Sequence, residues 1–252
     1  MDNFFQNMDE PKELDLRTSF VSPITGISIL INNFSLFMLV LLCSLSTCFS
    51  LFLTVFALVT IPVFISMINL MVINKVLGTG LTVLELMPYV YKNFKVKLLF
   101  FCGMIIIPLC LSIIIYLLSG TISRTAMIYT GFGFVCFSLV WGLLITNGLL
   151  LCNNDKYRLS DICVKSIDLI YKKPALLFGQ IIVWIMEIMF CMSILFSYVI
   201  ILPYLGMGVG SLSYTVTTYI IVFFVASLFI SFYISGISVL LLNWYRNDIN
   251  RQ

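Results

Sequence analysis

The stretch Tyr171-Lys172-Lys173-Pro174 ends an amphipathic segment and stands directly before a long apolar run. Two earlier stretches, Tyr91-Lys92-Asn93-Phe94 and Asn32-Asn33-Phe34, hold the same position before apolar runs of their own. Each of the three stretches is followed by two apolar runs, a pattern that predicts a helical hairpin. The chain is therefore predicted to form three hairpins, all entered from the same side of a membrane.

The composition is that of a membrane protein. Of the 252 residues, 61% are hydrophobic and 10% are charged, far from the average of soluble domains. No charged residue occurs between Arg17 and Lys75, and a spanning helix needs about 20 apolar residues. The predicted fold class is an all-α polytopic membrane protein with six transmembrane helices. They are expected in the apolar runs 34–50, 52–73, 98–118, 126–150, 175–203 and 214–243.

One domain is expected in this chain. Residues 18–245 are predicted to form a single six-helix transmembrane domain, between an acidic cytoplasmic tail at 1–17 and a short cytoplasmic tail at 246–252. A signal peptide at 34–50 is disfavoured, because the residues before it are acidic and a signal peptide begins with basic ones.

Positive charge predicts the orientation. Of the 14 lysines and arginines, only Arg124 falls in a connection predicted to face outside. Cytoplasmic loops carry an excess of Lys and Arg, so we expect a multi-pass protein of the cell membrane with both termini in the cytoplasm. The net charge of +3 reflects this orientation. Nucleic acid is not an expected partner, because no basic stripe lies on an exposed surface.

The segment 159–171, which precedes the third hairpin, is amphipathic. Its apolar residues recur with the period of a helix, and its charged residues lie on the opposite face. Such a helix is expected to lie in the headgroup plane of the bilayer, with its lysines near anionic lipid. We predict contact with lipid headgroups or a partner protein for the lysines of this region and of its counterpart before the second hairpin: Lys92, Lys95, Lys97, Lys165, Lys172 and Lys173.

The other two lead-in segments are less regular. In 81–94 the pattern is interrupted by Pro88, so a broken or kinked helix is expected there. In 18–31 it is weakened by Pro23 and Gly26.

Glu187 is the one acidic or basic residue deep inside an apolar run. It lies 12 residues after Ala175, about 18 Å along a helix and near the bilayer midplane. A carboxylate is costly at that depth unless it is protonated, paired or facing water. Two interpretations stay open: a proton, cation or substrate site, or a protonated carboxyl that hydrogen-bonds to a neighbouring helix through Asn147 or Asn69.

Small residues recur in the last apolar run. Ser227, Ser231 and Ser235 follow one another at intervals of four, a spacing that favours close helix packing. A polar lining for a transport path is the alternative interpretation. Gly131 and Gly133 predict similar packing in the fourth run.

Catalytic and metal chemistry find little support in the sequence. The chain has eight cysteines and no histidine, and no CxxC motif occurs, so no cofactor, metal site or disulfide is expected. Without histidine, the triads and acid–base pairs that depend on it are excluded. An enzyme is not expected, although an intramembrane enzyme stays open as a third class.

The threefold pattern of amphipathic lead-in, Asn/Lys-Phe/Pro step and apolar hairpin resembles a broad bacterial family of six-helix membrane proteins. That family includes the membrane domain attached to some glycerophosphodiester phosphodiesterases. The resemblance covers roughly residues 18–245. It implies a membrane-embedded helper, and it does not imply phosphodiesterase activity, which belongs to a soluble domain.

The chain is also similar in length and helix count to the permease subunits of small bacterial ABC exporters. These too begin with an amphipathic segment and present a cytoplasmic coupling helix to an ATPase. The similarity implies that 81–94 and 159–171 contact a separate ATPase, since no Walker motif occurs in this sequence.

The expected function is accordingly that of an integral membrane transport component. It would be a permease-like subunit that acts with partner subunits and is a candidate homo-oligomer. The alternative is a non-transporting scaffold or membrane-homeostasis protein that binds lipid or protein partners.

Overall fold

The computed structural model describes residues 5, 16–50, 54–118, 124–172, 174–204 and 211–245. Within these ranges every secondary-structure element is an α-helix, which confirms the all-α fold class. Apart from Phe5, Leu16 and Arg17, the two predicted tails lie outside the described residues. The helices are α2 (Leu16–Ile31), α3 (Phe34–Ser50), α4 (Thr54–Leu77), α5 (Val83–Tyr91), α6 (Phe94–Leu118), α7 (Arg124–Leu151), α8 (Leu159–Lys172), α9 (Pro174–Tyr204) and α10 (Leu212–Tyr245).

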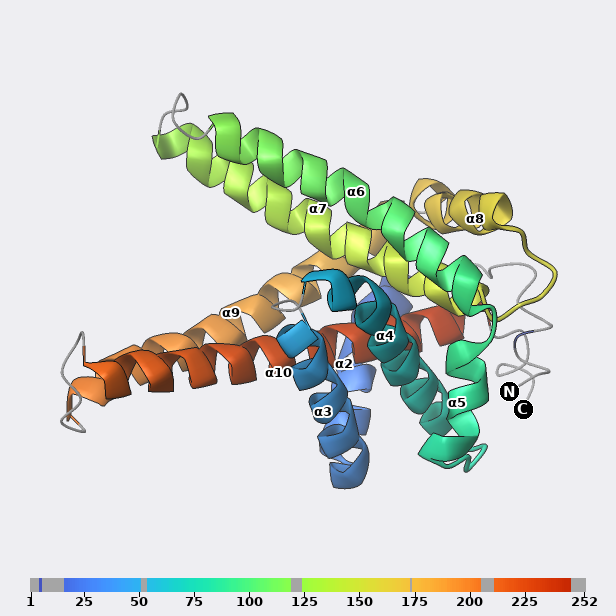
Figure 1. Ribbon diagram of the computed structural model, residues 1–252, viewed down its shortest axis with the longest axis horizontal. Coiled ribbons are helices and arrows are strands. Elements are labelled where there is room, and N and C mark those ends of the chain that lie inside the picture. Colours follow the sequence, from blue (N-terminus) through green and yellow to red (C-terminus); the bar gives the residue numbers. More distant parts are fainter. Residues whose placement is uncertain are drawn as a thin grey trace.

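The helices follow the predicted threefold arrangement. The pairs α3–α4, α6–α7 and α9–α10 form hairpins, and each is preceded by one lead-in helix, α2, α5 or α8 (Figure 1). The α6–α7 and α9–α10 hairpins diverge toward separate tips (Figure 1). Helix α10 contacts α2, α3, α4, α7 and α9, so it forms the centre of the bundle.

Five of the described helices are long and apolar enough to cross a membrane: α4, α6, α7, α9 and α10. Helix α3 has only 17 residues, about 25 Å at 1.5 Å per residue, which is less than the hydrocarbon thickness of about 30 Å. It is long and apolar enough to cross a membrane only when α2 is counted with it, and the two helices are bent by 106° relative to each other. The chain is thus a multi-pass membrane protein whose predicted sixth span requires the bent α2–α3 pair.

Two spanning helices extend past the predicted apolar runs. Helix α6 begins at Phe94, four residues before the run at 98, and α4 continues to Leu77, four residues after the run that ends at 73. Hydropathy misses these turns because they contain lysines such as Lys75 and Lys95. Lysine is a good helix former, so the backbone hydrogen bonds continue through these residues.

The lead-in helix α5 is not broken at Pro88. It is described as one helix from Val83 to Tyr91 with the proline inside it, so the predicted break is absent. A capping box fixes its first turn: the Thr82 hydroxyl accepts a hydrogen bond from the Glu85 backbone N–H, and the Glu85 carboxylate accepts one from the Thr82 N–H at 2.7 Å. Helix α2 likewise continues through its proline.

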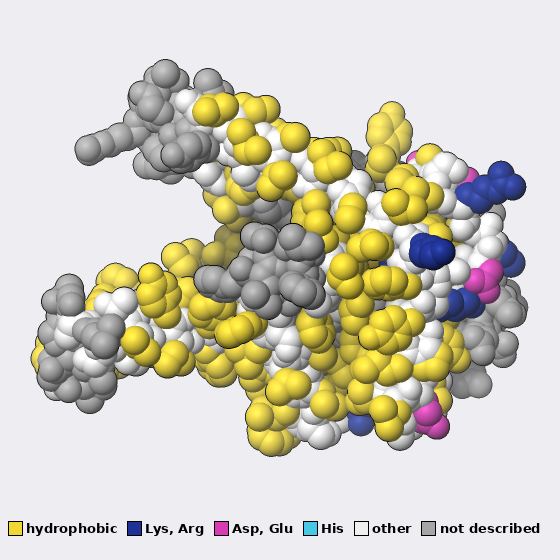
Figure 2. All heavy atoms as spheres, in the orientation of Figure 1, with side chains coloured by type: hydrophobic (Ala, Val, Ile, Leu, Met, Phe, Trp, Pro, Cys, Tyr) yellow, Lys and Arg dark blue, Asp and Glu magenta, His cyan; other side chains and the backbone are white. Residues whose placement is uncertain are grey.

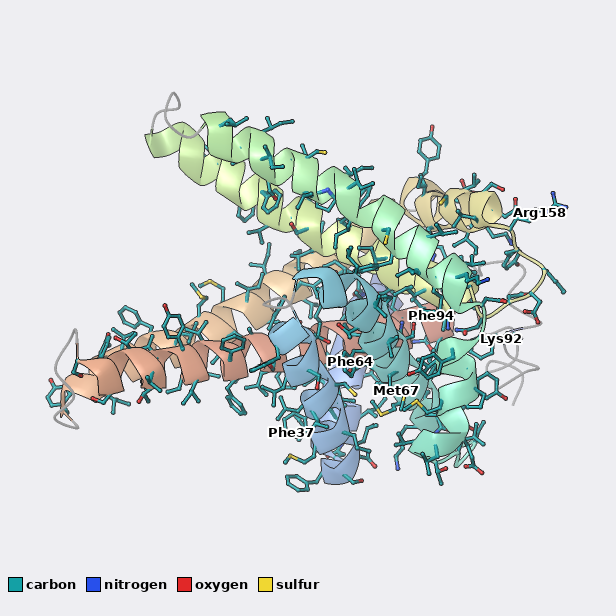
Figure 3. The ribbon with its side chains drawn as sticks, in the orientation of Figure 1. Phe37, Phe64, Met67, Lys92, Phe94 and Arg158 are labelled. Atoms are coloured by element: carbon teal, nitrogen blue, oxygen red, sulfur yellow. The ribbon has the colours of Figure 1, made fainter. Side chains whose placement is uncertain are left out.

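The charged surface lies at one end of the molecule. Lys, Arg, Asp and Glu side chains gather there, whereas the arms that lead to the hairpin tips are covered by hydrophobic side chains (Figure 2). Lys92 at the α5–α6 turn and Arg158 before α8 both lie at this end (Figure 3). Such a separation suits a protein with its apolar arms in a bilayer.

Candidate functional site

The buried carboxyl of Glu187 lies inside α9, in the apolar segment Gly179–Ile201. Its side chain is only 6% exposed. Neither carboxylate oxygen has a hydrogen-bond partner among the described residues. A buried polar group without a partner costs about 1–3 kcal/mol, and more when it is charged. This position is therefore costly in the conformation described.

Glu187 lies on a face of α9 that is buried in the bundle. Trp184, three residues earlier, and Cys191, four residues later, are buried as well. The indole Nε1 of Trp184 also has no hydrogen-bond partner among the described residues. Its ring meets the ring of Tyr233 on α10 edge-on, with 5.0 Å between the centroids. One helix face thus presents a carboxyl and an indole N–H, neither of which has a hydrogen-bond partner in the part of the chain that the structure describes.

Tyr233 does not supply the missing donor. Its hydroxyl donates to the backbone carbonyl of Leu139 on α7. Gly142, on the same helix, makes room for this contact, because a Cβ atom at that position would collide with the tyrosine hydroxyl. The junction of α7, α9 and α10 is thereby packed around a tyrosine that is bonded away from the carboxyl.

The two asparagines predicted as alternative partners of the buried carboxyl do not bond to it, and the amide nitrogen of Asn147 has no partner among the described residues. The amide oxygen of Asn147 accepts from the Tyr245 hydroxyl at 2.9 Å. Asn69 accepts from the Ser238 hydroxyl and donates to the Thr146 carbonyl at 3.4 Å. They belong to a polar layer between α4, α7 and α10. The prediction that they satisfy Glu187 is therefore wrong, because the facing side of each helix could not be read from depth alone.

Lys97 is buried, contrary to the prediction that it meets headgroups or a partner. Its ammonium group donates to the backbone carbonyls of Tyr89 and Val90 and to the side-chain oxygen of Asn153, each at 2.8 Å. These three bonds use all its donors inside the protein. Helical spacing carried a signal for this, since Lys97 shares a buried face with Phe100 at the next turn.

Lys92 and Asn93 join the α5–α6 turn to the connection between α7 and α8. Lys92 forms an ion pair with Asp155 at 2.8 Å. Asn93 has a left-handed backbone with φ of 51°, and its amide donates to Asp155 at 2.9 Å and to the Cys152 carbonyl at 3.0 Å. The hydrogen bonds from Lys92 and Asn93 lower the pKa of the Asp155 carboxyl. We refer to these contacts, with those of the buried lysine, as the polar clasp.

The remaining lysines of the predicted set differ in accessibility. Lys95 is exposed. Lys165 is partly buried, and its ammonium donates to the Tyr157 hydroxyl at 2.7 Å and lies 4.1 Å from the centre of that ring. The side chain of Lys172 and the whole of Lys173 lie outside the described residues.

The three serines at intervals of four lie on the buried face of α10. Ser231 donates to the Ser44 hydroxyl of α3 at 2.9 Å, and Ser227 lies one turn before it. Ser235 lies where α2 crosses, so that a Cβ atom added to Gly26 would come 2.7 Å from its carbonyl carbon and oxygen. The serines are thus placed at the contacts of α10 with α3 and α2.

The glycines predicted to pack on α7 do not do so. An added Cβ atom at Gly131 or Gly133 would have no atom of the described residues within 4 Å. Gly142 and Gly148 are close-packed instead: a Cβ atom at Gly142 would collide with the Tyr233 hydroxyl, and one at Gly148 would overlap the ring of Phe100 on α6.

Within α9, the carboxyl of Glu187 is the one acidic or basic side chain among the described residues that could bind a proton or a cation. In the part of the chain that the structure describes, no group of three or more His, Cys, Asp and Glu side chains could hold a metal ion. At the polar clasp, burial raises the pKa of the Cys152 thiol to about 12, so this thiol stays protonated at neutral pH. No protein-family model matches the sequence, and no curated protein or solved structure matches it either.

Proposed function

We propose that this chain is an integral membrane transport component, a permease-like subunit in which Glu187 takes up a proton or a cationic group during transport. The observation that supports this proposal is the buried carboxyl with no partner among the described residues. In a static scaffold, a carboxyl at this position would be satisfied by a neighbouring helix. Here Asn69 and the Tyr233 hydroxyl are bonded elsewhere, and the amide nitrogen of Asn147 has no hydrogen-bond partner among the described residues, the Glu187 carboxyl included.

Partner subunits belong to the same proposal. The lead-in helices α5 and α8 lie at the charged end of the molecule (Figures 1 and 2), where a separate ATPase or another subunit in the cytoplasm would bind. Lys95, which is exposed, and Lys92, which is partly exposed and paired with Asp155, would meet acidic groups of the partner. Co-purification from native membranes tests this, with wild type compared against Lys92→Ala/Lys95→Ala and Lys172→Ala/Lys173→Ala.

A carbodiimide tests whether Glu187 is reached from the membrane. Dicyclohexylcarbodiimide partitions into lipid and reacts with protonated carboxyl groups, so it should modify wild type in proteoliposomes. Glu187→Gln should lose this modification. The matched control Glu85→Gln removes an exposed carboxyl outside the spanning helices, and it should be modified as wild type is. No modification of wild type would contradict access to the carboxyl.

Proton movement tests the transport proposal itself. Proteoliposomes that contain a pH-sensitive dye are given a proton gradient, and its decay is followed. We expect the proton gradient to decay faster with wild type than with Glu187→Gln. With Glu85→Gln it should decay at the wild-type rate. Equal rates for wild type and Glu187→Gln would remove this residue from proton movement and favour the scaffold.

A lipid-binding scaffold is the second candidate function, and one observation favours it. An open groove of about 760 Å³ lies between the outer halves of α3 and α10, lined by side chains such as Leu42, Phe49, Ile220 and Phe224. Its described lining includes no charged residue, so it suits an acyl chain better than a polar solute. Retention of lipid by the protein through delipidating purification, together with absent proton movement, would support this function.

A further inference from the structure

The three lead-in helices share one register. Counted back from Phe34, Phe94 and Pro174, the first residues of the spanning helices that follow, positions 10, 7 and 3 residues earlier are apolar in all three copies. These positions are Ile24, Ile27 and Ile31 in α2, Leu84, Met87 and Tyr91 in α5, and Val164, Ile167 and Tyr171 in α8. At about 100° per residue, the three positions lie along one side of each helix.

Eight of these nine apolar side chains are exposed to the surroundings, and Ile27 of α2 is half-buried. At the position 10 residues back, Leu84 is 79% exposed, Val164 is 59% exposed and Ile24 is 58% exposed. At the position 3 residues back, Tyr171 is 86% exposed. We call each set of three residues the outer apolar stripe of its helix. None of the nine residues is fully buried in the protein core.

A different side of each helix packs against the protein. Eight residues before the spanning helix, Leu86 of α5, Ser166 of α8 and Gly26 of α2 are all buried. Four residues before it, Leu30 and Val90 are buried. Around the helix, the position 8 residues back lies about 100° to 160° from the three stripe positions, and the position 4 residues back lies about 60° to 120° from them.

A third side is polar. The residue that follows the first stripe position, about 100° around the helix, is Thr25, Glu85 or Lys165. The position 2 residues before the spanning helix is polar as well: Asn32 and Lys92 lie just past the ends of α2 and α5, and Lys172 is the last residue of α8. Each lead-in helix therefore presents three sides of different chemistry: one packed on protein, one apolar and exposed, and one polar.

A helix with three such sides suits a place where protein, acyl chains and water meet. We propose that α2, α5 and α8 lie at the interface of the leaflet at the charged end, α2 there instead of forming a span together with α3, each with its outer apolar stripe among phospholipid acyl chains and its polar side toward headgroups. Tyr91 and Tyr171 have the amphipathic rings that are enriched at this depth.

The surface at the bend between α2 and α3 also favours acyl chains as the ligand of the outer apolar stripe. Ile31 ends α2 with 67% exposure, and Phe34 begins the bilayer helix α3 with 72% exposure. The exposed apolar surface therefore passes directly from the stripe to a helix of the membrane domain, and the same acyl chains can cover both. This assignment does not depend on the transport function proposed above.

A photoreactive side chain identifies what touches each stripe. A phenylalanine analogue that carries a diazirine is introduced at Leu84 or Val164, and at the sequence neighbours Glu85 or Lys165 as matched controls on the polar side. The full chain is placed in nanodiscs of phosphatidylcholine and phosphatidylglycerol, and separately kept in native membranes. The carbene formed by light inserts into the nearest molecule, and mass spectrometry then distinguishes lipid, water and protein adducts.

We expect lipid adducts at the Leu84 and Val164 positions in both preparations, and mainly water adducts at the Glu85 and Lys165 positions. Water adducts at the stripe positions would overturn the proposal. Protein adducts in native membranes would show that the stripes bind a partner or a second copy instead. Leu84, Glu85 and Val164 are exposed and Lys165 is partly buried in the structure, and an unchanged melting temperature confirms that each substituted chain is folded.

Discussion

Gly26 of α2 faces the backbone of Gly236 of α10, so closely that a Cβ atom on Gly26 would lie 2.7 Å from the Gly236 nitrogen. The reverse addition, on Gly236, would place a Cβ atom 3.0 Å from the Cα atom of Pro23. The first lead-in helix is thereby held directly against the central helix of the bundle. Both contacts are with backbone atoms, which cannot rotate away as a flexible side chain would.

Alanine at Gly26 should separate these two helices. Overpacking of this kind costs about 1–3 kcal/mol, so Gly26→Ala is expected to lower the melting temperature in detergent or nanodiscs. Gly103→Ala is the matched control within α6, because an added Cβ atom there has no atom within 4 Å. The control should be neutral or gain up to about 1 kcal/mol from helix propensity. Equal effects of the two substitutions would contradict the close crossing.

The contact between Gly148 and Phe100 should show a compensating pair. Gly148→Ala is expected to destabilise the protein by about 1–3 kcal/mol, because the new methyl group overlaps the buried Phe100 ring. A smaller side chain in Phe100→Leu leaves room for that methyl group. The double variant should therefore be more stable than the sum of the single effects predicts, by about 0.5–3 kcal/mol. Strict additivity in thermal unfolding would argue against this contact.

Removal of the Lys97 ammonium should weaken the polar clasp. Lys97→Met keeps the length of the side chain but leaves the side-chain oxygen of Asn153 without this donor. An unsatisfied buried group costs about 1–3 kcal/mol, so the melting temperature should fall. Lys95→Met, two residues earlier and exposed, is the control and should have little effect. A melting temperature unchanged in both variants would show that Lys97 is not held as described.

The ion pair in the polar clasp predicts a dependence on pH. The folded protein lowers the pKa of Asp155 through hydrogen bonds from Lys92 and Asn93, so its carboxylate stabilises the fold above the usual aspartate pKa of about 3.9. That contribution is lost as the pH falls through the lowered folded value. Because the carboxyl is 67% exposed, the contribution of this ion pair to the free energy of unfolding should be no more than about 1 kcal/mol.

Asp155→Asn isolates this effect. Wild type should melt at a slightly higher temperature than the variant near neutral pH, and the difference should vanish as the pH falls below the aspartate range. Melting curves of both proteins across that range provide the measurement. A difference that grows toward acid pH would have the wrong sign for a carboxyl with a lowered pKa.

The sequence predicts the helices better than it predicts their contacts. Long apolar runs, the polar steps before them and the position of Lys and Arg together identify three hairpins, because the cost of burying backbone polar groups in lipid leaves a helix as the main solution. Helix ends are less well predicted, as the lysine-containing first turn of α6 shows. Hydropathy measures side chains, whereas the helix is continued by its backbone.

The candidate site could be predicted only in part. Glu187 is identified by its charge within an apolar run, but depth in the membrane alone does not identify its hydrogen-bond partners. The structure directs Asn147 toward Tyr245 and Asn69 toward Ser238. Rotation of each helix about its own axis decides such pairings, and hydropathy does not report that rotation when a helix is apolar on all sides.

The sequence by itself determined that this is an all-α membrane protein of three hairpins with amphipathic lead-in helices, since hydrophobic run length and charge position are properties of the chain. Only the tertiary structure decided that Lys97 is an internal donor, that Glu187 lacks a partner among the described residues, and that the lead-in helices keep an exposed apolar side. These depend on which helix faces which. That choice is made by close packing between segments far apart in sequence, as at the crossing of Gly26 and Gly236.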